Sequence, residues 1–210
     1  MKIRLFAAAI SGLFLFAFHG NAQTTDTRSL SSFDKIAVSG GFETLILKEG
    51  SSESVTIEAT GINADKIKTE VHGGTLEIGM KRGNHGHYKA KITVTYRSLK
   101  EIANSGSTDI EAVSVIKGER FEFAGSGSGD FKGSFDVDKL EIAISGSSDM
   151  KLNGKAQKQE IAISGSGDVD ASGLKGKEAS VAISGSGDVK LNVDGPVRSS
   201  VSGSGNVSNN

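Results

Sequence analysis

The sequence predicts an all-β protein, a parallel β-helix or closely related β-solenoid with right-handed winding. A phrase of the form Ser-Gly-Ser-Gly-Asp recurs six times, and its last residue advances by 21, 19, 19, 20 and 18 positions. The residues around each copy keep one apolar and polar pattern, and no segment has a helical period. A repeat of this length is typical of stacked rungs, here of about 19–20 residues in the C-terminal half. The copies end at Asp109, Asp130, Asp149, Asp168, Asp188 and Asn206.

The first 22 residues are typical of a secretory signal peptide. Lys2 and Arg4 precede an apolar run from Leu5 to Phe18, and small residues precede the expected cleavage site after Ala22. The run is shorter than the roughly 20 residues that a membrane-spanning helix needs. We therefore expect an exported chain with no transmembrane segment. Residues 23–32 are polar and without period, which predicts a flexible N-terminus before a single domain over residues 33–210.

The N-terminal half predicts strands that form longer, irregular rungs. Its apolar and polar residues alternate between Gly-rich or charged breaks, as in half-buried strands. The opening Ile-Ala-Val-Ser-Gly at residues 36–40 resembles the later Ile-Ala-Ile-Ser-Gly phrase and predicts a first rung. The expected strands are 35–38, 42–47, 54–59, 66–71, 75–80 and 90–96.

From Lys100 onward, alignment of the repeats produces columns of equivalent residues. A strand period of two directs three apolar columns to the core and an alanine column to the surface. One rung cannot bury its apolar side, but rungs stacked about 4.8 Å apart form continuous apolar ladders. An antiparallel β-sandwich is the alternative fold. The columns are Ile102, Phe123, Ile142, Ile161 and Val181; Ala103, Ala124, Ala143, Ala162 and Ala182; Asn104, Gly125, Ile144, Ile163, Ile183 and Val201; and Ile110, Phe131, Met150, Val169, Val189 and Val207.

The aspartates that end the phrases form the sharpest candidate site. Carboxylates about 4.8 Å apart repel one another unless they are hydrogen-bonded, solvated or bridged by cations. Calcium is the natural cation for oxygen ligands, but calcium-binding β-rolls repeat every nine residues with paired glycines. The favoured interpretation is a structural column in which each Asp caps its own turn, a role that Asn206 can also fill. The column is Asp109, Asp130, Asp149, Asp168 and Asp188.

Other outward columns suggest contacts with partners. A glutamate column (Glu101, Glu122, Glu141 and Glu160) stacks like charges, which Lys132 and Lys151 or a partner could relieve. The serine columns are explained by corner geometry rather than by binding of glycans or ice. The alanine column allows close approach of another subunit, and an exposed coil end could pair edge to edge, so self-association to a homo-oligomer is a hypothesis.

His85 and His87 are weak metal candidates, because imidazoles on alternate residues can face the same way. Their Gly- and Asn-rich surroundings predict an exposed loop, and no cofactor is expected. The formal net charge of −1, about −3 without the signal peptide, argues against nucleic acid as a partner. The chain has no cysteine, which excludes disulfides. Neither a Gly-x-Ser-x-Gly elbow between strand and helix nor a column of arginines is present, so we expect no enzyme activity.

The opening of residues 33–40, the strands Val55–Glu58 and Leu76–Ile78, and the Ser-Gly-Ser-Gly-Asp rungs together resemble the autotransporter adhesin head GIN domain family. The likeness covers residues 33–207. It implies a β-helical, non-enzymatic protein of the periplasm or cell surface, of the type exported by Bacteroidetes, in a family of unknown function. We expect an interaction module for an unidentified protein or glycan of the cell envelope. The alternative is a β-helix that binds or cleaves polysaccharide.

Overall fold

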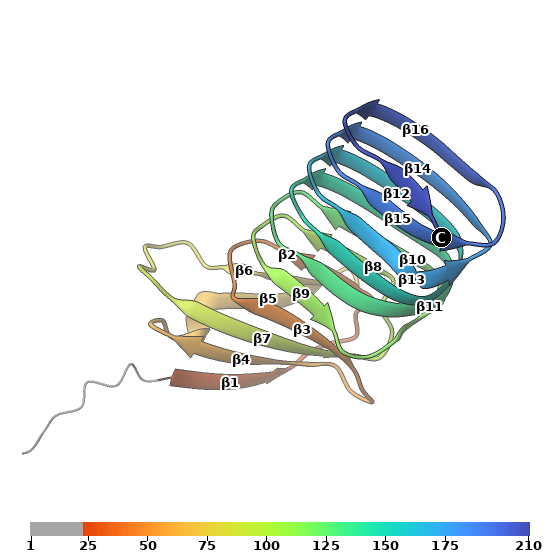
Figure 1. Ribbon diagram of the computed structural model, residues 1–210. Helices are drawn as coiled ribbons and strands as arrows, with labels where there is room; N and C mark the ends of the chain where they lie inside the picture. Colours follow the sequence, from red (N-terminus) through yellow and green to blue (C-terminus); the bar gives the residue numbers. More distant parts are fainter. Residues whose placement is uncertain (1–22) are drawn as a thin grey trace, which may run out of the picture.

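The computed structural model describes residues 23–210, so the predicted signal peptide, residues 1–22, lies outside the described residues. The chain forms one 17-stranded sheet that winds into a β-solenoid of about six turns, which confirms the predicted fold class. Figure 1 shows the coil rising from a group of N-terminal strands. The described part contains no helix long and apolar enough to cross a membrane.

The strands follow the predicted ranges closely in the N-terminal part. They are β1 (Gln23–Ser29), β2 (Lys35–Val38), β3 (Thr44–Glu49), β4 (Ser54–Thr60), β5 (Ile67–His72), β6 (Thr75–Met80) and β7 (Lys89–Tyr96), with a 3-10 turn, η1 (Ala64–Lys66). The repeats form β8 (Glu101–Asn104), β9 (Asp109–Ala112), β10 (Ile116–Gly125), β11 (Phe131–Gly146), β12 (Met150–Gly165), β13 (Val169–Gly176), β14 (Glu178–Gly185), β15 (Val189–Val193), β16 (Val197–Gly203) and β17 (Val207–Asn209).

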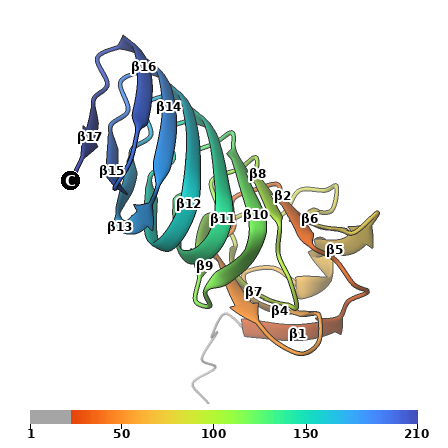
Figure 2. The same cartoon turned by 90° about the vertical axis from the view of Figure 1, so that its right-hand side faces the viewer.

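Each turn of the coil crosses two facing ladders of parallel strands. The first ladder runs β6–β2–β8–β10–β11–β12–β14–β16. The second runs β7–β3–β9–β11–β12–β13–β15–β17. The long strands β11 and β12 bend around one side of the coil and contribute to both ladders, as Figure 2 shows. The space between the ladders holds the core.

The register of the parallel ladders confirms the predicted columns. Ile142 pairs with Phe123 on one side and Ile161 on the other, and all three side chains are buried. The alanines of the next column pair in the same way and face outward. The rung predicted at residues 36–40 is also confirmed as part of the stack, because the strand beginning at Lys35 pairs with the one beginning at Glu101, four residues in register.

The N-terminal rungs are stacked in an order that differs from the order of the chain. Strands β6 and β7 follow β2 and β3 in sequence, yet they lie on the outer side of them, away from the repeats. The first ladder is then extended by β5, and the second by β4 and β1, all in antiparallel pairing. Parallel stacking therefore ends here in a small antiparallel cap.

The expectation of a flexible segment over residues 23–32 is wrong for Gln23–Ser29, which forms β1 and pairs with β4 along its whole length. Arg28 holds the strand in place, since its guanidinium donates to the carbonyl oxygens of Ala64 and Ile67 at 2.8 Å and to Thr69 Oγ1 at 2.7 Å. Backbone pairing and this side chain stabilise the strand without apolar residues, so a search for apolar alternation misses it.

The repeated phrase forms the corner at which the chain turns from the first ladder to the second. A Cβ on Gly127, Gly146 or Gly165 would lie 2.0–2.2 Å from the carbonyl oxygen of the equivalent glycine in the preceding rung. Glycine is therefore required by close stacking of the corners as well as by the positive φ of Gly146 and Gly165.

Candidate binding face

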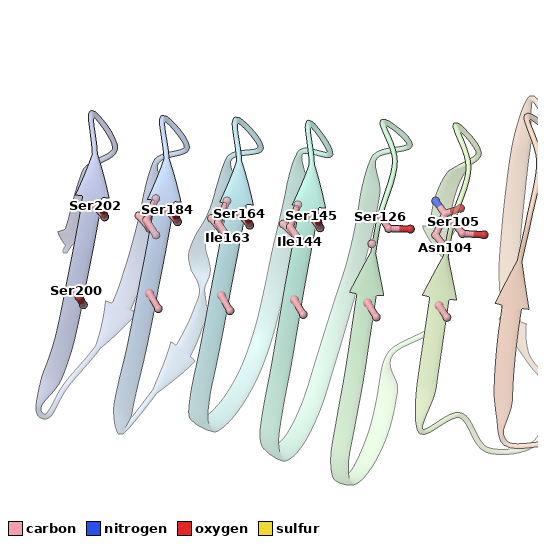
Figure 3. A pocket seen from close by; sticks show the side chains of 17 residues that line it. Asn104, Ser105, Ser126, Ile144, Ser145, Ile163, Ser164, Ser184, Ser200 and Ser202 are labelled. Atoms are coloured by element: carbon pink, nitrogen blue, oxygen red, sulfur yellow. The ribbon is translucent and has the colours of Figure 1, made fainter.

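The outer surface of the first ladder carries rows of small side chains on adjacent strands. We call the two central rows the Ala–Ser face. Figure 3 shows these side chains stacked along strands β8 to β16. The face consists of Ala103, Ala124, Ala143, Ala162, Ala182 and Ser200 in one row and Ser105, Ser126, Ser145, Ser164, Ser184 and Ser202 in the other.

The Ala–Ser face forms a broad, open groove of about 700 Å³. No outward side chain in these two rows is larger than serine, so the floor of the groove lies close to the backbone of the strands. The edges of Ile144 and Ile163, which otherwise belong to the core, are therefore part of its lining. Ala143, Ala162 and Ala182 are themselves exposed. A surface with apolar methyl groups beside a row of hydroxyls can contact a partner closely over several rungs, and it contains no acid, base or metal ligand.

A ladder of ion pairs borders the Ala–Ser face. Lys139 Nζ lies 2.5 Å from Glu141 and 2.9 Å from Glu160, and Lys158 Nζ lies 2.9 Å from Glu160. Nearer the N-terminus, Arg120 lies 2.6 Å from Glu141. The hydrogen bond from Lys139 lowers the pKa of both glutamates, and Arg120 adds to the effect at Glu141. The like charges of the predicted glutamate column are therefore neutralised within the chain.

The prediction that Lys132 and Lys151 relieve this column is wrong. Both lie beyond the corner, on the second ladder, where Lys132 pairs with Glu111 at 3.4 Å. The relevant cations precede the glutamates by two residues, as in Lys139-x-Glu141 and Lys158-x-Glu160, and so point to the same side of the same strand. This spacing is the signal by which the sequence could have identified them.

The aspartate column is bonded between rungs rather than within turns. Oδ1 of Asp149 accepts a hydrogen bond at 2.9 Å from the backbone N–H of Asp168, the next aspartate of the column. The same bond recurs at every step, from Asp109 to Asn206, over 2.8–3.0 Å. Each Asp therefore caps the following turn, which differs from the expectation that it caps its own. Asn206 is the last residue of this series, and its backbone N–H donates to Oδ1 of Asp188.

This architecture matches a known family. The family described as "Putative auto-transporter adhesin, head GIN domain" matches residues 32–210. The chain belongs to this family. Membership in an adhesin-like family indicates an extracellular or cell-envelope protein. Strand β1 precedes the residues that the family model matches.

Solved structures share the fold of this head GIN domain over nearly its whole length. A "putative adhesin" from Bacteroides fragilis has a TM-score of 0.81 at 20% identity, covering 91% of this chain and 98% of its own. A "putative lipid binding protein" from Parabacteroides distasonis has a TM-score of 0.68 at 21% identity, covering 91% and 98%. A "putative adhesin" from Parabacteroides merdae has a TM-score of 0.68 at 19% identity, covering 90% and 96%. The comparison with curated proteins finds no match.

The two predicted metal candidates lie in the loop between β6 and β7 of this head GIN domain. His85 Nε2 lies 2.5 Å from the carbonyl oxygen of Lys81, and His87 is exposed. Within residues 23–210, no group of three or more His, Cys, Asp or Glu side chains gathers in a way that could hold a metal ion. A metal at this loop, or calcium at the aspartate column, stays a prediction without a described ligand set.

The aromatic side chains of the coil belong to its core. Phe121, Phe123, Phe131 and Phe135 are buried and pack against one another, with ring centroids 5.0–6.0 Å apart. None of them is available on the surface to stack against a sugar ring. Among the described residues, the exposed large apolar side chains of the coil are therefore valines rather than aromatic residues: Val113, Val115 and Val201.

Proposed function

We propose that this head GIN domain is a non-enzymatic, adhesin-like module exposed at the cell surface, and that the Ala–Ser face binds a protein partner. The observation that carries the proposal is the continuous groove of about 700 Å³ along the first ladder. The description of the family as an adhesin supports the function, and the lack of acid–base groups in the groove supports a binding role.

A protein is favoured over a glycan because sugar sites commonly present aromatic rings, and the four phenylalanines of the coil are buried. A shallow groove lined by methyl and hydroxyl groups suits the close approach of another polypeptide surface, where shape rather than charge determines the contact. The ion-pair ladder beside Ala143 and Ala162 lies at the border of the groove, where polar groups surround the apolar centre of a typical interface.

The test measures adhesion of beads coated with residues 23–210 to immobilised extracellular-matrix proteins and to a glycan array. Ala162→Arg places a long charged side chain in the groove, and Ser52→Arg adds the same charge in the exposed turn between β3 and β4. We expect binding to a protein surface that Ala162→Arg weakens at least tenfold and Ser52→Arg leaves unchanged. Equal binding by both variants would contradict the face, and reproducible binding to glycans alone would favour the polysaccharide alternative.

Protease treatment of intact cells tests the location. Digestion of the protein on intact cells supports surface exposure, whereas full protection until the outer membrane is opened would place it in the periplasm and contradict an adhesive role.

A further inference from the structure

The C-terminal end of the coil ends in an unpaired strand edge. Among the described residues, β16 pairs only with β14, and β17 only with β15. Figure 2 shows both strands at the end opposite the N-terminal strands. Val201 occupies the column of Ile163 and Ile183, which are 3% exposed, yet Val201 is 41% exposed because none of the described strands covers it. The end therefore presents both free backbone groups and apolar core.

This edge lacks the features that protect other edges of the same sheet. At the opposite end, β1 carries Asp26 and Arg28, and β5 carries Lys68 and Glu70. Charged residues on an outer strand oppose pairing with another chain. By contrast, Arg198 is the only charged residue from Val197 to Asn210. Repeat proteins ordinarily need a polar cap on each terminal rung, and within residues 23–210 such a cap lies only on the N-terminal side of the coil.

Both acidic columns also end before this edge. The aspartate column ends in Asn206, and the glutamate column continues as Ser180 in β14 and Arg198 in β16. If two copies met at this end, the aspartate and glutamate columns of one copy would not face the same columns of the other. The contact would therefore involve no repulsion between stacked carboxylates. A charge pattern of this kind is compatible with contact between identical surfaces.

We propose that the C-terminal edge is a self-association interface, at which β16 of one chain pairs with β16 of a second copy across a two-fold axis. Identical edges related by a two-fold axis must pair antiparallel, and each contributes the same residues. An axis perpendicular to the ladders extends both at once, because β16 and β17 end the two facing ladders at the same end of the coil. The contact satisfies the free backbone groups of β16 and covers Val201.

The first test measures the mass of residues 23–210 by light scattering over a range of concentrations. We expect a dimer that dissociates on dilution. Val201→Lys places a charge at the interface and should lower the dimer affinity at least tenfold. Val115→Lys is the matched control, since Val115 is 40% exposed, close to the value for Val201, but lies at the turn before β10. It should leave the mass unchanged.

A second measurement does not depend on the stability of the lysine variant. The chain has no cysteine, so Ser200→Cys, in the middle of β16, introduces a single thiol near the proposed axis. Oxidation should yield a disulfide-linked dimer, whereas Ser145→Cys on β11, away from the end, should stay monomeric under the same conditions. A wild-type protein that is monomeric throughout, a larger assembly that Val201→Lys does not alter, or equal cross-linking of both cysteine variants would overturn the proposal. A monomer would leave the edge to a strand of a different chain.

Discussion

Replacing Gly165 by alanine tests whether close stacking of the corners demands glycine. A Cβ at this position would lie 2.1 Å from the carbonyl oxygen of Gly146, and Gly165 has a φ of +142°. The same oxygen accepts a hydrogen bond from the N–H of Ser166 at 2.9 Å. The substitution therefore strains the backbone and separates two rungs at a point where they are bonded.

The magnitude follows from these contributions. A non-glycine residue in this backbone region costs about 1–3 kcal/mol, and relief of an overpacked contact costs about 1–3 kcal/mol more. Weakening the hydrogen bond to Gly146 adds about 1 kcal/mol. We expect Gly165→Ala to lower the free energy of unfolding by about 3–7 kcal/mol, a large part of the typical stability of a domain of about 5–15 kcal/mol.

Urea unfolding followed by circular dichroism measures this free energy, with Gly41→Ala as the matched control. A Cβ on Gly41 would meet no atom within 4 Å, and Gly41 has no positive φ. Its replacement should change stability by less than about 1 kcal/mol, in the stabilising direction, because alanine restricts the unfolded chain. If Gly165→Ala lies within about 1 kcal/mol of this control, corner stacking does not require glycine and the reasoning fails.

Three further predictions concern single side chains. Asp149→Ala removes the acceptor for the next rung and should cost about 1 kcal/mol in urea unfolding, whereas Asn206→Ala should cost nothing measurable; equal costs would contradict bonding between rungs. Lys139 lowers the pKa of Glu160, so this stabilisation is present above the unfolded pKa and is lost as the pH falls through the folded pKa. Lys139→Met should make the fall in Tm on acidification shallower, and an unchanged slope would count against the ion pair. Burial disfavours the ionised phenolate and raises the pKa of Tyr96 to about 12, so the stability of the fold is unaffected by this titration below the unfolded pKa and falls as the pH rises from there towards 12. Tyr96→Phe should abolish this loss and gain about 1 kcal/mol at neutral pH, because the buried hydroxyl has no partner within residues 23–210; a loss of stability would reveal a hydrogen bond.

The coil could be predicted from sequence because each rung repeats the same pattern of apolar, small and turn-forming residues. The column of Ile142 and Ile161 is visible in any alignment of the phrases, and alternation along one strand assigns Ala143 and Ser145 to the outer face. Both rows of the candidate binding face were therefore recognisable. The sequence did not reveal that the two rows form one groove. The depth of a groove depends on how far the side chains of the neighbouring rows extend from the sheet.

The ion pairs and the aspartate bonds show where prediction from repeats fails. Lys132 follows the corner closely in sequence, but the corner turns it to the other ladder, away from the glutamates. The aspartate side chains bond to an N–H about 19 residues away rather than to their own turn. Both errors assume that residues near in sequence interact, whereas in a stacked coil the nearest neighbour of many groups lies one rung away.

The sequence by itself determined the β-solenoid, the residues that form its core and the position of its corners. These depend on strand alternation and on a repeat, and both are local patterns. Only the tertiary structure decided that β6 and β7 stack outside β2 and β3, and that the polar strand β1 joins the edge of β4. Strand order and edge pairing depend on backbone hydrogen bonds that almost any sequence can form, so the apolar pattern does not specify them.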